Sequence, residues 1–184
     1  MRRRREALGA ALVLVPWVAL GARDAAHVDR ITAAHEGIAG ALAIVSALAA
    51  YFQEPHLDGA HRCPTAGEGD TGEVGPTPPL AVACAAGRGE RCRAREAPTA
   101  AAEYPSALWH EAPLWRDLDY EITEPHAFHY ALRTRNEGGA CDFVVSAVAD
   151  LDGDGEHSRI EVHGRLDGSG VMLDPTWRID QPTE

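Results

Sequence analysis

The stretch CDFVVSAVADLDGDGEHSRIEVH, residues 141–163, contains two β-rich segments on either side of a short acidic loop. The segment 143–148 before the loop and the segment 160–162 after it are dominated by β-branched and apolar residues, which favour strands. The Asp and Gly residues between them favour a tight connection. We therefore predict a strand-loop-strand unit, and with it an antiparallel sheet rather than a helix-loop-helix pair.

The acidic loop has the residue spacing of a calcium-binding loop. Carboxylates stand at positions one, three and five, glycine at six, serine at nine and glutamate at twelve. Alternate carboxylates on a turning backbone converge on one hard cation, and the glycine permits the bend. The predicted Ca²⁺ ligands are the side chains of Asp150, Asp152, Asp154 and Glu161, the backbone carbonyl of Glu156, and Ser158 as a further candidate. The alternative is a solvated Asp/Gly turn that binds no metal.

Length and composition favour one globular domain with additional segments. The chain has 184 residues, of which 45% are hydrophobic, enough for one sizeable core. Its formal net charge is −11, and the sequence shows no arginine patch in the globular part. Because phosphate backbones are bound by basic faces, this charge argues against nucleic acid as a partner.

The four cysteines, Cys63, Cys84, Cys92 and Cys141, lack the spacing of a zinc site. Disulfides are therefore favoured if the compartment is oxidising. Cys84 and Cys92 bracket a short Gly/Arg-rich loop and are the first choice for a bridge. Cys63 and Cys141 then follow by elimination, and free buried thiols are the alternative.

The N-terminus, residues 1–22, is predicted to be a signal or membrane-anchor segment. Residues 2–5 are arginines and precede an apolar run over residues 7–22. Such a pattern engages the export machinery and keeps the arginines in the cytoplasm. The run is shorter than the ~20 residues of a full membrane span. Two outcomes stay open: cleavage near Ala22, or retention as an inner-membrane anchor with the rest of the chain in the periplasm or outside the cell.

A long amphipathic helix is predicted over residues 23–54. The interval 24–53 contains no proline, and alanine, the best helix former, recurs throughout. Apolar residues recur at alternating steps of three and four, which predicts one stripe facing the core. The predicted stripe comprises Val28, Ile31, His35, Ile38, Leu42, Val45, Ala49 and Phe52, and His35 interrupts it as a residue expected to be partly exposed or hydrogen-bonded. Gly37 and Gly40 lower the helix propensity, and we expect them to mark close approach to a neighbour.

The globular head is predicted over residues 55–184. Residues 55–105 are rich in Gly and Pro and are expected to form a loop region held by the disulfides, with one short helix over 108–118 after it. Within a sheet region spanning 118–180, strands are predicted at 120–123, 127–134, 141–149 and 158–163, with at most one more short strand towards the C-terminus. The predicted fold class is α+β, with the long N-terminal helix packed on a small antiparallel β-sheet.

Five segments occur in a fixed order along the chain. They are AAYFQE at 49–54, TP at 77–78 ahead of Cys84 and Cys92, PLWRDLDY at 113–120, PHAFHYAL at 125–132, and ADLDGDG at 149–155. In this order they resemble type IV pilin-like proteins and pseudopilins, particularly those of deltaproteobacterial type. In that family an aromatic helix end enters the head, and an acidic loop joins two strands. The resemblance implies a pilin-like subunit of the cell envelope, in a fibre or in type II secretion assembly, with other such subunits or secretion-assembly proteins as partners.

The leader of this chain differs from that of the family it resembles. Family members carry a basic stretch ending in glycine, then phenylalanine and, a few residues on, a glutamate that positions the subunit in the fibre. Here the basic stretch leads to Gly9, but no Phe follows and the apolar run contains no glutamate. Two interpretations follow, a divergent minor subunit or a pilin-like head with an ordinary signal. The alternative function is a secreted calcium-dependent binding module released from a signal peptide.

Sequence motifs for catalysis are weak. The closest histidine pair, His126 and His129, lacks the glutamate of a zinc-protease motif, and its odd spacing on a strand would send the two rings to opposite faces. No G-x-S-x-G motif, phosphate loop or Cys/His nucleophile constellation occurs. The sequence therefore argues against an enzyme.

Overall fold

The computed structural model describes residues 32, 34–54, 56, 60–67, 69–84, 91–151, 155–174 and the backbone of 178–180. The predicted signal or anchor segment 1–22, the first part of the predicted helix, and Asp152 and Asp154 lie outside these residues. The elements in chain order are the N-terminal helix Ala34–Gln53, β1 Thr71–Thr77, β2 Arg93–Arg95, β3 Glu103–Pro105, α2 Ala107–Glu111, α3 Pro113–Asp117, β4 His129–Glu137, β5 Ala140–Ala149, β6 Ser158–Asp167, β7 Gly170–Leu173 and β8 Arg178–Asp180.

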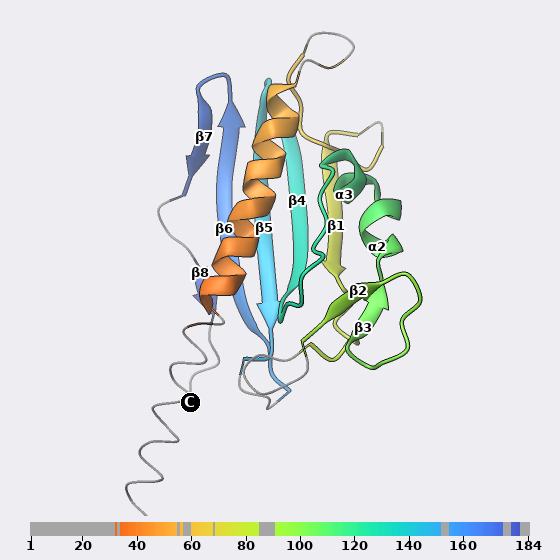
Figure 1. The fold of residues 1–184 in the computed structure, drawn as a ribbon. Helices are drawn as coiled ribbons and strands as arrows, with labels where there is room; N and C mark the ends of the chain where they lie inside the picture. The colour runs from red at the N-terminus through yellow and green to blue at the C-terminus, as the bar shows by residue number, and fades with distance from the viewer. Residues whose placement is uncertain are drawn as a thin grey trace, which may run out of the picture.

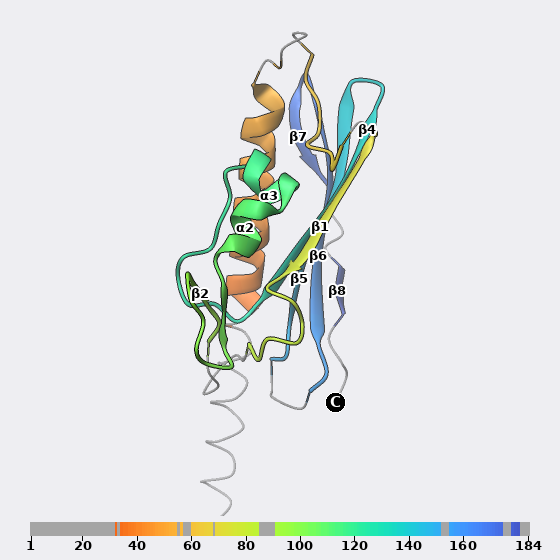
Figure 2. The ribbon, with the colours of Figure 1, turned by 90° about the vertical axis from the view of Figure 1, so that its right-hand side faces the viewer.

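The fold class is α+β, as predicted, with the helices on one face of an antiparallel sheet. The strand order is β1-β4-β5-β6-β7, and β8 pairs with β6 beyond the end of β7. The long helix crosses the centre of the sheet, with α2 and α3 beside it over β1 (Figure 1). The view along the sheet shows all three helices on the same side, which leaves the other face open (Figure 2). We call this face the open face.

The predicted strand-loop-strand unit is the central hairpin of the sheet. β5 and β6 pair in register from Cys141 opposite Leu166 to Ala149 opposite Ser158. Alternate residues of β5 such as Phe143 and Val145 are buried beneath the helix, because successive side chains of a strand point to opposite faces. The residues between them lie on the open face.

Small residues, rather than the predicted stripe alone, set the face that the N-terminal helix turns to the sheet. The buried residues of this helix are Gly37, Ala41, Ile44, Val45, Leu48 and Phe52. A methyl group at Gly37 would lie 2.6 Å from the ring of Phe128, so this glycine does mark a close approach. Leu42 is wrong as a core position, because it is exposed, and His35, which interrupts the predicted stripe, is exposed as well. The rings of Phe128 and Tyr130 lie directly against Gly37 and Gly40, so the glycines face the sheet.

Four of the predicted segments differ from the structure. The loop region 55–105 contains β1, an edge strand where its Gly and Pro residues are tolerated. The single predicted helix over 108–118 is two helices, since Ala112 is extended before Pro113. Residues 120–123 form no strand; Tyr120 instead packs its ring against the indoles of Trp109 and Trp115. The C-terminal part forms two strands, β7 and β8, rather than at most one.

Two disulfides hold the loop region: one closes a short loop within it, and the other joins it to the sheet. Cys84 bonds to Cys92, and Cys63 bonds to Cys141 on β5, in the pairing that the sequence favours. No cysteine among them is free. These bridges fit an oxidising compartment outside the cytoplasm.

Candidate functional site

The acidic loop begins directly after β5 and turns as the calcium-loop spacing requires at its sixth position. Gly155 has a φ of 90°, a conformation that glycine adopts without strain. Its backbone N–H donates a hydrogen bond of 3.0 Å to a carboxylate oxygen of Asp150. The first and sixth positions are therefore held together, while Asp152 and Asp154 lie outside the described residues.

The predicted ligand at the twelfth position, Glu161, is not brought to the loop. Its carboxylate accepts hydrogen bonds from Ser146 at 3.3 Å and from Arg159 at 3.4 Å, and lies 3.2 Å from the Nε2 atom of His163. Burial acts to raise the pKa of Glu161, but the hydrogen bonds from His163 and Arg159 outweigh it and hold the pKa below its ordinary value. Glu161 is thus an ion-pair centre in the middle of β6.

The geometry of the strand explains why the predicted ligands separate. In a helix-loop-helix protein, the helix after the loop returns the twelfth residue to the cation. Here Ser158 and Glu161 are three residues apart on a strand, so their side chains lie on opposite faces of the sheet. Of the predicted ligands, Asp150 is held to the loop through Gly155, whereas Asp152 and Asp154 lie outside the described residues. Within the described residues, no three His, Cys, Asp or Glu side chains gather as a metal cluster.

The two histidines considered for a metal site have separate structural roles. His126 is 3% exposed, and its Nε2 atom lies 2.7 Å from the hydroxyl of Tyr104, which also accepts a hydrogen bond from the indole of Trp109. Its Nδ1 atom lies 2.7 Å from the carbonyl oxygen of Phe128. Burial lowers the pKa of His126 to about 4, so this ring is neutral at neutral pH.

His129 is buried on β4 and packs against the segment of residues 78–84. Its Nδ1 atom lies 2.8 Å from the carbonyl oxygen of Pro78, and 3.9 Å from the sulfur of Cys84. Burial lowers the pKa of His129 as well. The ring of His129 therefore contacts the segment that carries Pro78 and Cys84, while the ring of His126 contacts Tyr104 on β3.

The outward side of the N-terminal helix is the candidate site with the clearest geometric signal. Its exposed residues recur every three or four positions along the whole helix. They are Thr32, His35, Ala39, Leu42, Ala43, Ser46, Ala50 and Gln53. None is Asp, Glu, Lys or Arg. We call this set the outer helix stripe.

The one acidic residue of the helix does not contribute charge to this stripe. Glu36 is held by Arg91 at 2.5 Å and by the backbone N–H of Ala127 at 2.9 Å. An ordinary surface helix carries charged residues on the side opposite the core. In a chain with a net charge of −11, an outer stripe without Asp, Glu, Lys or Arg therefore sets this helix apart from an ordinary surface helix.

The apolar periodicity of the helix did not predict this surface, although the sequence carries a signal for it. The helix sequence contains one charged residue, Glu36, in Ala34–Gln53. A count of charges on each helical face, in addition to the search for an apolar stripe, would have found it.

Comparisons with protein families, with curated proteins and with solved structures find no match to this chain. The functional interpretation therefore depends on the residues and their arrangement alone.

Proposed function

We propose that this chain is a non-enzymatic, pilin-like subunit of the cell envelope that assembles with other copies or with related subunits through its N-terminal helix. The observation that carries the proposal is the outer helix stripe. It presents alanine, serine and leucine along the length of the helix, and small side chains let two helix backbones approach closely. The polar head would then surround a core of packed helices.

Two further features support this proposal. The apolar run over residues 7–22 leads into the helix with only a short polar break, which suits a helix that starts in a membrane. Both disulfides lie in the head, which suits a head outside the cytoplasm. The proposed compartment is the inner membrane with the head in the periplasm, or the extracellular side.

A charged residue on the outer helix stripe tests the proposal. Ala43→Glu places a carboxylate in the middle of the stripe, and glutamate is a good helix former, so the head should fold normally. We expect crosslinking of the full chain in membranes to detect oligomers for the natural protein and to lose them for Ala43→Glu, with an unchanged melting temperature. The matched control is Ala66→Glu, which adds the same charge at an exposed position outside the helix.

Equal crosslinking of Ala43→Glu and Ala66→Glu would rule out assembly through this helix. Loss of crosslinking in both variants would instead show that added charge alone prevents association. Either result removes the basis of the pilin-like function.

A second candidate function is a secreted calcium-dependent binding module. The hydrogen bond between Asp150 and Gly155 favours it, because it closes the acidic loop as a calcium site requires. This candidate requires release of the chain from residues 1–22 and a ligand that binds only in the presence of Ca²⁺.

A further inference from the structure

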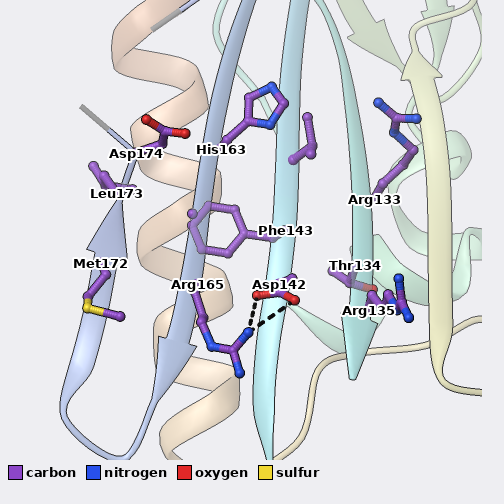
Figure 3. Close-up of a pocket in the computed structure, with 12 residues that line it drawn as sticks. Arg133, Thr134, Arg135, Asp142, Phe143, His163, Arg165, Met172, Leu173 and Asp174 are labelled. Atoms are coloured by element: carbon purple, nitrogen blue, oxygen red, sulfur yellow. Dashed lines mark hydrogen bonds and ion pairs between the residues drawn. The ribbon is translucent and has the colours of Figure 1, made fainter. Parts of the chain in front are cut away.

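The open face of the sheet carries a shallow hollow of about 790 Å³ across β4, β5, β6 and β7. Figure 3 shows Arg133 and Arg135 at one side of the hollow and Met172 and Leu173 of β7 at the other, with Arg165 and Asp142 between them. The strand register explains this arrangement, since Arg135, Asp142, Arg165 and Met172 follow one another across four strands. The sequence alone did not show this patch, because its residues come from separate strands.

The arginines of the hollow differ in their partners. The guanidinium of Arg165 lies 3.0 and 3.3 Å from the two carboxylate oxygens of Asp142 and 3.8 Å from Glu137. Arg133 and Arg135 are exposed, and neither forms an ion pair or a side-chain hydrogen bond with any residue that the structure describes. Glu73 stands opposite Arg133 in the β1–β4 register, yet no ion pair joins them. Arg165 is thus paired with Asp142, whereas Arg133 and Arg135 have no ion-pair partner among the described residues.

Two neighbouring cations do not stabilise this subunit. Arg133 and Arg135 are alternate residues of β4, so they point to the same face, about 7 Å apart along the strand. Like charges at this distance repel, and exposed arginines without partners gain nothing in return. Their spacing equals that between alternate side chains of a second extended segment.

The hollow also contains apolar surface, beside the polar side chains of Thr134, His163 and Asp174. Val144 lies beside Arg133 in the β4–β5 register and is half-buried, and Met172 on β7 is 53% exposed. A partner in the hollow would therefore contact the guanidinium groups of Arg133 and Arg135 on one side and apolar side chains on the other. Arginine binds carboxylates through two parallel hydrogen bonds, which gives geometric selectivity as well as attraction.

We propose that this hollow binds an extended acidic peptide segment of a partner protein, with carboxylates at alternate positions paired to Arg133 and Arg135 and apolar side chains laid over Val144 and Met172. Charge complementarity supports an acidic occupant, since these are unpaired cations in a chain with a net charge of −11. The shallow shape suits a peptide surface better than a small molecule, which is bound in an enclosed pocket. This contact uses the open face, whereas the proposed assembly uses the helix, so each stands without the other.

Fluorescence anisotropy with the purified full chain in detergent tests the proposal. The probe is a labelled peptide in which glutamate alternates with valine, and the control peptide carries glutamine in place of glutamate. We expect the double variant Arg133→Gln/Arg135→Gln to raise the Kd of the glutamate peptide roughly tenfold, with the binding weaker at higher salt. The matched control is Arg93→Gln/Arg95→Gln, which removes two alternate exposed arginines from β2 and should leave the Kd unchanged.

Three outcomes would overturn the proposal. The first is absence of binding by the natural chain, and the second is equal binding of the glutamate and glutamine peptides. The third is tighter binding, through Arg133 and Arg135, to vesicles that contain phosphatidylglycerol, which would assign the hollow to a lipid surface. Melting curves of both double variants establish that any loss comes from the missing guanidinium groups and not from unfolding.

Discussion

At the scale of single residues, the buried contact between Tyr104 and His126 shows how this head satisfies polar groups away from water. The hydroxyl of Tyr104 accepts a hydrogen bond from the indole N–H of Trp109 and lies within hydrogen-bonding distance of the His126 ring. One oxygen therefore has two polar partners. Burial raises the pKa of Tyr104 to about 12 and lowers that of His126 to about 4. Both shifts favour the neutral forms. The cluster is therefore stable only while the imidazole carries no proton.

This cluster predicts a loss of stability in mild acid. Unfolded His126 takes up a proton below a pH of about 6.5, but the folded residue does so only near its pKa of about 4. Between these values the unfolded state binds more protons, so the free energy of unfolding falls as the pH falls. Keeping His126 neutral is expected to change the free energy of unfolding by about 3 kcal/mol across this pH window. This stability is fully present above pH 6.5 and is lost as the pH falls towards 4.

Urea denaturation at neutral pH and at about pH 4.5 measures this effect. We expect His126→Gln, whose amide cannot take up a proton in this range, to be less stable at neutral pH and to show a smaller loss on acidification. An unchanged pH dependence in His126→Gln would assign the acid sensitivity to other groups.

At the scale of elements, sequence patterns predict an element where local preference and tertiary context agree. The β5–β6 hairpin was predictable because the β-branched residues around the acidic turn also alternate between buried and open faces. β1 was not, because Gly75 and Pro76 disfavour a strand and only pairing with β4 makes one. The hydrogen bonds of Glu161 with Ser146 and Arg159 were not predictable from the ligand spacing, because they depend on the register of β5 and β6.

The contact between the N-terminal helix and the sheet predicts the effect on stability of replacing one glycine by alanine. Gly37→Ala should gain about 1 kcal/mol in helix propensity. The added methyl would lie 2.6 Å from Phe128 and 2.9 Å from Ile160, both of them buried. Overpacking of this kind costs roughly 1–3 kcal/mol, so we expect a net loss of about 1 kcal/mol.

Thermal unfolding compares Gly37→Ala with Ser46→Ala, a change on the exposed side of the same helix. The serine variant should melt at the same or a higher temperature, because only the propensity changes. A higher melting temperature for Gly37→Ala would mean that Phe128 moves aside without cost.

The acidic hairpin predicts which carboxylates calcium binding needs. If the loop binds Ca²⁺ through its first residues, Asp150→Asn should abolish the heat of calcium binding to the full chain. Glu161→Gln should leave that heat nearly unchanged, since its carboxylate is engaged on β6 with Ser146, Arg159 and His163. Isothermal calorimetry at millimolar calcium measures both variants. Loss of binding in Glu161→Gln, or no heat from the natural chain, would contradict this assignment.

At the scale of the whole molecule, two segments compete as the membrane-associated part. The helix Ala34–Gln53 is long and apolar enough to cross a membrane by length and composition. However, its residues Ala41, Ile44, Leu48 and Phe52 are almost fully buried in the core of the head. A helix that spans the bilayer would have to give up these contacts. If the chain is attached to a membrane, the apolar run over residues 7–22 is therefore the segment that we expect to attach it.

We accordingly predict that the apolar N-terminus is retained and that it alone anchors the chain. After carbonate extraction of cell membranes, the natural protein should stay in the pellet, and mass spectrometry should find an N-terminus that precedes the apolar run. Leu42→Arg, on the outer helix stripe, should stay in the pellet as well, because a helix packed on the sheet does not enter the bilayer. Release of Leu42→Arg would show that Ala34–Gln53 is the anchor. A soluble natural protein beginning at Ala22 or Arg23 would instead favour the secreted module, because export would then have removed the apolar run that assembly in the envelope requires.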